Sequence, residues 1–228
     1  MVYLVSCKMT IEDETPARRP PLTKDRVLRA GVTLADRSGL DSLTMRRLGG
    51  ELGVEAMSLY KHVANKDEIL DGILELVVAE IEIPEAGSEW RSAMRKRAIS
   101  ARQVLRRHPW AIGLLESRSS VGPTAMRYLD SIIASLRAGG FSLVTAAHAF
   151  WVLDSYVYGH VIQELSLDSS HEPAEISENS TDRHGEEYPN LTELATLQAT
   201  TSTFAYETEF DFGLTLILDA LDAVRTDA

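Results

Sequence analysis

Helix-forming segments follow one another along this chain of 228 residues, and that succession most constrains its fold. Apolar residues recur with the period of an amphipathic helix, roughly 3.6 residues, and no stretch shows the alternation of a strand. Thr23, Thr44 and Asn65 stand where helix N-caps are expected, while Gly39 and Gly53 stand where helices should end or turn. The sequence therefore predicts an all-α fold.

The chain divides by composition into an arm and two domains. Residues 1–21 lack periodicity and hold three prolines, which predicts a flexible arm. Short helices over residues 22–68 predict a small three-helix domain, and longer helices over residues 69–228 predict a larger helical domain. Residues 168–190 contain seven acids, one arginine and almost no large apolar side chain, which predicts a mobile acidic loop.

Charge is distributed unevenly between the two parts of the chain. Residues 1–63 contain 10 Lys and Arg and 8 Asp and Glu, giving +2, whereas residues 64–228 contain 13 and 26, giving −13; the two add to the net −11. A mildly basic head on an acidic body is compatible with a nucleic-acid partner for the head. Chance is the alternative explanation for an asymmetry of this size.

Cysteine content and hydropathy place the chain in a broad class. The single cysteine, Cys7, cannot form an internal disulfide or a cysteine metal cluster, so we expect a reducing, cytoplasmic setting. No apolar run approaches the roughly 20 residues of a membrane span, so no membrane partner is expected.

The most informative segment is Leu43 to Leu70, which reads LTMRRLGGELGVEAMSLYKHVANKDEIL. Two short helices joined through Gly53, the second over residues 54–62, form a helix-turn-helix pattern. Arginines at the start of the first of these helices oppose its dipole, which makes sense where a phosphate lies nearby. Small residues at the start of the second helix allow close approach to base edges. The candidate DNA contacts are Thr44, Arg46, Arg47, Ala56, Met57, Ser58, Tyr60, Lys61 and His62.

These residues resemble a known family. From about Arg26 to Leu74 the chain resembles the DNA-binding domain of the TetR/AcrR family, through the helix that ends at Gly39, then LTMRRL, the turn LGV, LYKHV and NKDEIL. More weakly, RRHPW, LRAGGFS and FDFGLTLILDAL resemble the regulatory domain of the tetracycline-repressor branch. The resemblance implies a DNA-binding transcriptional regulator, a repressor released from its operator by a small-molecule ligand.

The resemblance also implies how DNA is read. A two-fold dimer would place one recognition helix in each half-site of a palindromic, double-stranded operator. Arg46 matches a position that reads a guanine edge, Tyr60 and Lys66 match phosphate-contacting positions, and residues 56–58 match base-reading ones. The family usually has alanine where Gly49 stands. Two glycines inside a short helix cost roughly 1 kcal/mol each relative to alanine, and they either loosen the helix or admit a close phosphate.

Two long helices are apolar on two sides and so predict a second partner. One begins at Ser142 and the other runs from Phe204 to about Val224. A helix with two apolar faces is buried on both, and a second copy of the chain is the commonest cover. We expect a homodimer with a four-helix interface; a central helix in a large monomer core is the alternative.

The resemblance implies a ligand pocket inside the C-terminal helices. Aromatic side chains with a few polar groups suit a small molecule, although ordinary core packing is an alternative for each apolar one. Asp154 stands out because a carboxylate between two apolar faces is costly unless it is paired or bound. Ligand binding would move the fourth helix, which connects the two domains, begins after Asn65 and is expected to end at Pro84. This movement would shift the population toward the released state. The candidates are Trp110, Leu114, Met126, Leu129, His148, Trp151, Asp154 and Tyr158.

Sequence motifs argue against a metal, a cofactor and catalysis. The tetracycline repressor binds its drug with magnesium through a histidine in the segment that here reads GLLESRSSVGP, and through paired histidines where this chain has AEIEIPEAGSEW; both segments lack histidine. No metal ligand or cofactor is therefore expected. No G-x-S-x-G, P-loop, G-x-G-x-x-G, H-E-x-x-H or C-x-x-C occurs. The alternatives to a ligand-released repressor are an activator, a regulator controlled by a partner protein, and a helical enzyme.

Overall fold

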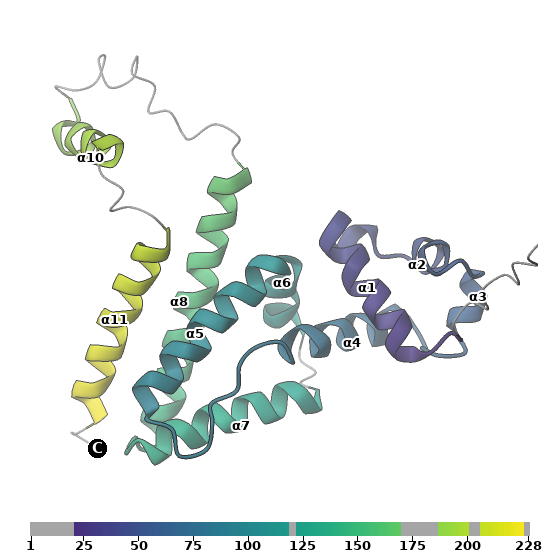
Figure 1. Cartoon of the computed structure of the whole chain (residues 1–228), viewed down its shortest axis with the longest axis horizontal. Coiled ribbons are helices and arrows are strands. Elements are labelled where there is room, and N and C mark those ends of the chain that lie inside the picture. The colour runs from purple at the N-terminus through teal and green to yellow at the C-terminus, as the bar shows by residue number, and fades with distance from the viewer. Residues whose placement is uncertain (1–20, 119–121, 170–186, 201–205, 226–228) are drawn as a thin grey trace, which may run out of the picture.

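The computed structural model describes residues 21–118, 122–169, 187–200 and 206–225 (Figure 1). Throughout these ranges the regular secondary structure is helical, and no strand occurs in them. The all-α prediction is confirmed. The predicted arm, except for Pro21, and the larger part of the predicted acidic loop lie outside the described residues.

The N-terminal helices begin at the residues that cap them. Side-chain oxygens of Thr23, Thr44 and Asn65 accept hydrogen bonds from backbone N–H groups three residues further on, as predicted. Each cap satisfies a donor that a helix start otherwise leaves free. The elements are α1 (Lys24–Ser38), the 3-10 turn η1 (Leu40–Ser42), α2 (Met45–Leu52), α3 (Ala56–Leu59) and α4 (Lys66–Val78).

Two predicted helix lengths are wrong. The third helix, predicted over residues 54–62, is only α3, because the Val54 N–H bonds the Gly49 carbonyl within the turn. After Leu59 the chain continues in tighter turns, in which the His62 N–H bonds Leu59 three residues back. The fourth helix was predicted to reach residue 84 but ends at Val78, and the chain then winds with the same three-residue spacing.

The C-terminal helices include the two long helices predicted from the sequence. Ser142 lies before α8, and its hydroxyl accepts from the Thr145 N–H as a cap should. Helix α8 continues through Ser169, two residues into the segment predicted as a loop. The elements are α5 (Trp90–Arg107), α6 (Trp110–Ser117), α7 (Pro123–Ala138), α8 (Leu143–Ser169), α10 (Pro189–Thr200) and α11 (Tyr206–Arg225).

Two hydrophobic cores meet along α4. Buried residues between Val27 and Ile73 form the first core, and those between Val77 and Leu221 form the second. Helix α4 leads from the small bundle of α1 to α3 into the larger bundle (Figure 1). The boundary predicted at residue 68 falls within this helix. Trp110 packs against both cores, so it lies at their junction.

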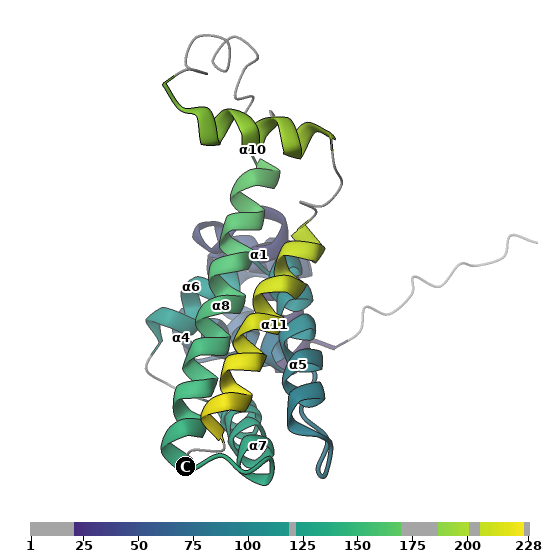
Figure 2. The ribbon, with the colours of Figure 1, turned by 90° about the vertical axis from the view of Figure 1, so that its left-hand side faces the viewer.

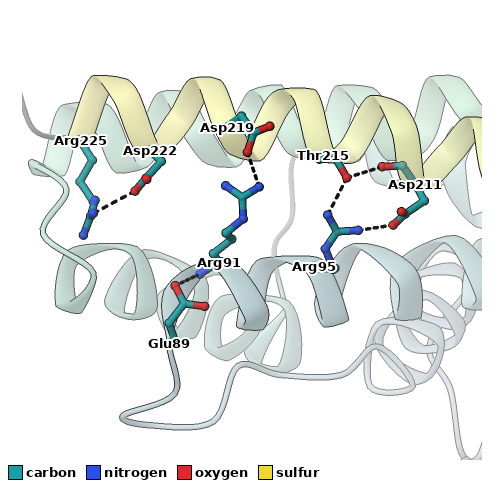
Figure 3. A network of polar contacts seen from close by, with 8 residues as sticks. All are labelled: Glu89, Arg91, Arg95, Asp211, Thr215, Asp219, Asp222 and Arg225. Atoms are coloured by element: carbon teal, nitrogen blue, oxygen red, sulfur yellow. Dashed lines mark hydrogen bonds and ion pairs between the residues drawn. The ribbon is translucent and has the colours of Figure 1, made fainter.

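Helix α11 is held to α5 by ion pairs as well as by apolar contacts on α8. Arg91 pairs with Asp219, and Arg95 pairs with Asp211 and donates to the Thr215 hydroxyl at 2.7 Å (Figure 3). At the far end of α11, Arg225 donates to the Gly139 carbonyl at 2.9 Å. These contacts align α5, α8 and α11 side by side (Figure 2). No described helix is long and apolar enough to cross a membrane.

Candidate DNA-binding surface and cavity

Helix α2 packs closely at Gly49 against the turn that leads into α3. Gly53 takes the left-handed conformation that the turn requires, with a φ of 67°. A Cβ added at Gly49 would lie 2.8 Å from the Val54 carbonyl oxygen and 3.2 Å from the Ala56 nitrogen. Around Gly50, by contrast, a Cβ would meet nothing within 4 Å. Gly49 therefore permits close packing within the helix-turn-helix. This role differs from the two considered from the sequence, which were a loosened helix and a close phosphate.

The predicted DNA contacts gather on α2, α3 and the turns that follow α3. Met57 has 74% of its surface exposed, which is unusual for a large apolar side chain within a folded domain, and Tyr60 is 47% exposed. Ala56 and Ser58, which flank Met57, have small side chains that leave room for close approach to α3. Ala56, Ser58 and His62 are partly buried, and the exposed residues of this DNA-binding surface are Thr44, Arg46, Arg47, Met57, Tyr60, Lys61 and Lys66.

Cations on this surface lack the ion pairs that several other cations of the small domain form. Lys24, Arg29 and Arg37 each form an ion pair, with Glu68, Asp25 and Glu51 respectively. Among the described residues, no ion pair forms at the four cations of the DNA-binding surface, which are Arg46, Arg47, Lys61 and Lys66. Exposed cations that form no ion pair are available to phosphate oxygens.

A cavity of about 450 Å³ lies in the larger bundle. The end of α4, the end of α6, α7 and the middle of α8 form its walls. Its volume falls within the range of small-molecule sites, and its walls combine aromatic rings with a few polar groups. The lining residues are Val78, Ile81, Leu115, Glu116, Arg118, Ala125, Tyr128, Leu129, Phe150, Trp151, Asp154 and Tyr158.

Four of the eight ligand candidates line this cavity, namely Leu129, Trp151, Asp154 and Tyr158. The other four lie elsewhere. Trp110 lies at the junction of the two cores, where its indole Nε1 donates to Asp36 at 2.6 Å, and Leu114 is buried beside it on α6. Met126 and His148 are exposed, because they lie on the outward faces of α7 and α8.

Asp154 is buried and paired with a residue that the sequence analysis did not identify. Its partner is Arg97 of α5, whose Nη2 bonds the carboxylate and whose Nε donates to the Tyr128 hydroxyl at 2.7 Å. Tyr158 donates to the second carboxylate oxygen at 3.1 Å. Arg97 is 1% exposed. It lies within the apolar stripe of Met94, Ala98 and Ala101, and a cation at such a position is the signal that could have revealed it.

The pKa values within this cluster follow from burial. Burial alone would lower the pKa of Arg97, but Tyr128 and Asp154 more than offset this, and the pKa is raised. Burial raises the pKa of Tyr128 to about 12. Burial, reinforced by the charge of Asp154, raises the pKa of Tyr158 as well. The guanidinium therefore remains charged and both phenols remain protonated at neutral pH.

Two carboxylates of α4 are bound by residues next to the cavity. Arg118, itself a lining residue at the end of α6, pairs with Asp71. Glu75 accepts hydrogen bonds from the Thr124 and Ala125 N–H groups at 2.7 and 3.2 Å, and so caps the start of α7. Pro123 occupies the first position of that helix, where no N–H is required. The cavity wall is thus connected to the helix that enters the small domain.

A helix-turn-helix with free cations on one face, joined by a shared helix to an aromatic cavity, defines a DNA-binding transcriptional regulator. Comparison with known proteins agrees. The family model described as "Tetracyclin repressor-like, C-terminal domain" matches residues 83–225. This chain belongs to the TetR family.

Individual relatives support the assignment. The HTH-type transcriptional repressor DrrR1 of Streptomyces coeruleorubidus is 32% identical over 216 residues, covering 90% of this chain and 79% of that protein. An HTH-type transcriptional regulator of Saccharopolyspora erythraea is 38% identical over 147 residues, and the match spans 64% of this chain and 62% of the relative's length. The structure of ActR of Streptomyces coelicolor in complex with actinorhodin superposes with a TM-score of 0.72 at 29% identity, covering 90% of this chain and 99% of that one.

Proposed function

We propose that this chain is a homodimeric repressor that binds a palindromic operator through α2 and α3 and leaves it when a small molecule occupies the cavity. The observation that supports this proposal best is that α4 contributes residues both to the core of the small domain and to the cavity. Its first turns carry Ile69 and Ile73 into the core of the small domain, while Val78 at its end lines the cavity. One rigid helix therefore contacts both sites.

The connection between cavity and operator runs through the two carboxylates of α4. A ligand that displaces Arg118 would act on Asp71, because the two side chains form an ion pair. A ligand that shifts the start of α7 would act on Glu75, because backbone N–H groups of that helix start donate to its carboxylate. Movement of α4 would then alter the separation of the two recognition helices in a dimer. The ligand shifts the population only insofar as it binds the released arrangement more tightly.

Dimerisation is supported by apolar side chains left exposed on neighbouring helices. Val144 and Ile162 of α8 are 67% and 51% exposed, and Phe212 and Leu216 of α11 are 64% and 54% exposed. Both helices also contribute to the buried core on their other sides. Apolar surface of this extent is typical of a protein interface, and a second copy provides a matching one.

Ligand binding in the cavity is supported by relatives whose structures hold compounds in this fold. ActR binds actinorhodin, and its fold is shared over nine tenths of this chain. The four cavity residues predicted from the sequence, Leu129, Trp151, Asp154 and Tyr158, are proposed ligand contacts. Tyr128 and Phe150 join them because they line the same space.

A gel-shift experiment tests the DNA-binding part. The full chain is titrated on DNA from its own upstream region at two salt concentrations, alongside Arg46→Ala, Tyr60→Ala and the control Arg137→Ala, which removes an exposed arginine from the far end of α7. We expect a salt-sensitive shift that the first two variants lose and the control retains. Failure to bind there, followed by recovery of no sequence motif from random DNA, would refute the proposal.

A transcription assay separates repression from activation. Purified RNA polymerase is run on the shifted promoter with and without the protein. We expect less transcript when the protein is bound, because a dimer on a promoter operator blocks access. More transcript would identify an activator, and a shift with no change in transcript would contradict regulation at that promoter.

A further inference from the structure

A carboxylate in the cavity wall already forms an ion pair with a buried arginine of the protein. Asp154 lines the cavity and is 4% exposed, and its charge is matched by the buried guanidinium of Arg97. One carboxylate oxygen accepts from Arg97 and the other accepts from the Tyr158 hydroxyl. A buried ion pair whose oxygens are both bonded has little remaining attraction for an external cation.

Arg97 also has hydrogen-bonding capacity left over. Its Nη1 atom is buried and has no hydrogen-bond partner in the described part of the chain. The guanidinium carbon lies 5.3 Å from the centre of the Tyr128 ring and 5.7 Å from that of Phe150, and both rings line the cavity. A positive charge is therefore located immediately behind two aromatic walls. Because Arg97 already pairs with Asp154, a cation that enters beside these rings finds no unpaired buried carboxylate there.

Tyr128 lines the cavity, and its hydroxyl is a hydrogen-bond donor. It accepts a bond from Arg97 Nε, and among the described residues no acceptor takes its own proton. Since burial keeps this phenol protonated, the O–H is a donor, and the bond from a cation polarises it further. A ligand oxygen with a free lone pair would satisfy it.

The shape and composition of the cavity define the remaining features of the ligand. Tyr128, Phe150, Trp151 and Tyr158 contribute rings, and Leu129 adds aliphatic surface. Flat aromatic molecules bury their faces well against such rings. A volume of about 450 Å³ accommodates several fused rings.

We propose that the cavity selects flat aromatic effectors that carry oxygen acceptors and no positive charge, and that Arg97 sets this specificity by occupying Asp154, the buried one of the two carboxylates that line the cavity; the other, Glu116, is exposed to solvent. This inference rests on the cavity being the effector site of the proposed function. It concerns the ligand's charge, and it can be tested without DNA.

Two probes of matched size test the charge preference. Alizarin is a three-ring quinone with oxygen acceptors and no positive charge, and proflavine is a three-ring cation. Each is titrated into the purified full chain by calorimetry at neutral pH. We expect alizarin to bind at least about tenfold more tightly than proflavine, a difference of about 1.4 kcal/mol.

Substitutions at the pair then separate specificity from folding. In Arg97→Met, Asp154 is left without its cation, so we expect the preference to reverse toward proflavine by about tenfold or more. Arg97→Met leaves a buried unpaired carboxylate and can therefore be less stable. Its control is the double substitution Arg97→Met with Asp154→Asn, which removes both charges of the pair. The double variant should lose the gain in proflavine affinity. Tyr128→Phe should weaken alizarin and leave proflavine unchanged.

The outcomes distinguish this inference from the proposed function. Equal or tighter binding of proflavine by the unmodified chain overturns the inference, as does an unchanged preference in Arg97→Met or a gain for proflavine that persists in the double variant. Binding of neither probe by protein that still shifts its operator overturns the inference and leaves the DNA-binding function intact. Selective binding of alizarin by protein that shifts no DNA supports the inference and contradicts the proposed function.

Discussion

Trp110 of the larger bundle donates its indole N–H to Asp36 of α1 at 2.6 Å, and the same carboxylate oxygen lies 2.7 Å from the His108 Nδ1. One acceptor thus binds two donors across the junction of the two cores. Glu80, which pairs with Arg107, lies near the other side of the same histidine ring at 3.5 Å. The junction is therefore held by specific polar bonds in addition to the shared helix α4.

Replacing the acceptor should loosen the junction. Asp36→Ala leaves two donors without a partner, and we expect the free energy of unfolding to fall by about 1–3 kcal/mol. Urea titration followed by tryptophan fluorescence measures it. Asp25→Ala, which breaks an exposed ion pair on the same helix, is the matched control and should cost less than about 0.5 kcal/mol. Equal losses in the two variants would contradict a special role for Asp36.

Adjacent glycines in α2 should respond oppositely to alanine. Gly50→Ala fills open space and removes a helix penalty, so we expect the protein to be stabilised by about 0.5–1 kcal/mol. Gly49→Ala places a methyl 2.8 Å from the Val54 carbonyl, so the turn must shift and operator affinity should fall. Thermal unfolding and gel shifts compare the pair. Unchanged operator affinity in Gly49→Ala would show that the close packing does not position α3.

Removal of the Glu75 side chain should release the start of α7. Glu75→Ala leaves the Thr124 and Ala125 N–H groups without their acceptor, and we expect a loss of about 1–2 kcal/mol, as for other helix caps. Hydrogen exchange should accelerate at these two amides first. Glu116→Ala, which removes an exposed carboxylate that lines the same cavity and caps no helix, serves as the control. Slow exchange at both amides in Glu75→Ala would contradict the capping role.

The buried phenols should make stability depend on pH at the alkaline end. Burial raises the pKa of Tyr128 to about 12 and raises that of Tyr158, whereas an unfolded tyrosine ionises near pH 10. The unfolded chain therefore loses protons that the folded chain keeps, so stability falls as the pH rises from about 10 to about 12. Tyr128→Phe should flatten this slope. Chemical denaturation of the variant and the unmodified chain across this range measures the difference, and an equal slope in the two would contradict the role of the buried phenol.

The sequence predicts the helix starts well because capping is local. Thr23, Thr44 and Asn65 bond N–H groups three residues away, so each signal lies within one turn of chain. The Arg97–Asp154 pair joins residues 57 positions apart on separate helices, and although the apolar stripe of α5 marks Arg97 as buried, no local rule identifies its partner. The same reason explains why Trp110, expected at the ligand, lies at the junction instead.

Oligomeric state offers the most direct test of the apolar surface on α8 and α11. Phe212→Glu places a charge on a side chain that is 64% exposed in the single chain, so folding should be unaffected while a dimer should lose a buried aromatic contact. Sedimentation equilibrium should show monomers where the unmodified chain forms dimers. Met126→Glu makes the same change at a 59% exposed residue of α7 and should leave the dimer intact. Since two half-sites are bound together only by a dimer, Phe212→Glu should also weaken operator binding. Dimers that persist in Phe212→Glu at the same concentrations would place the interface elsewhere.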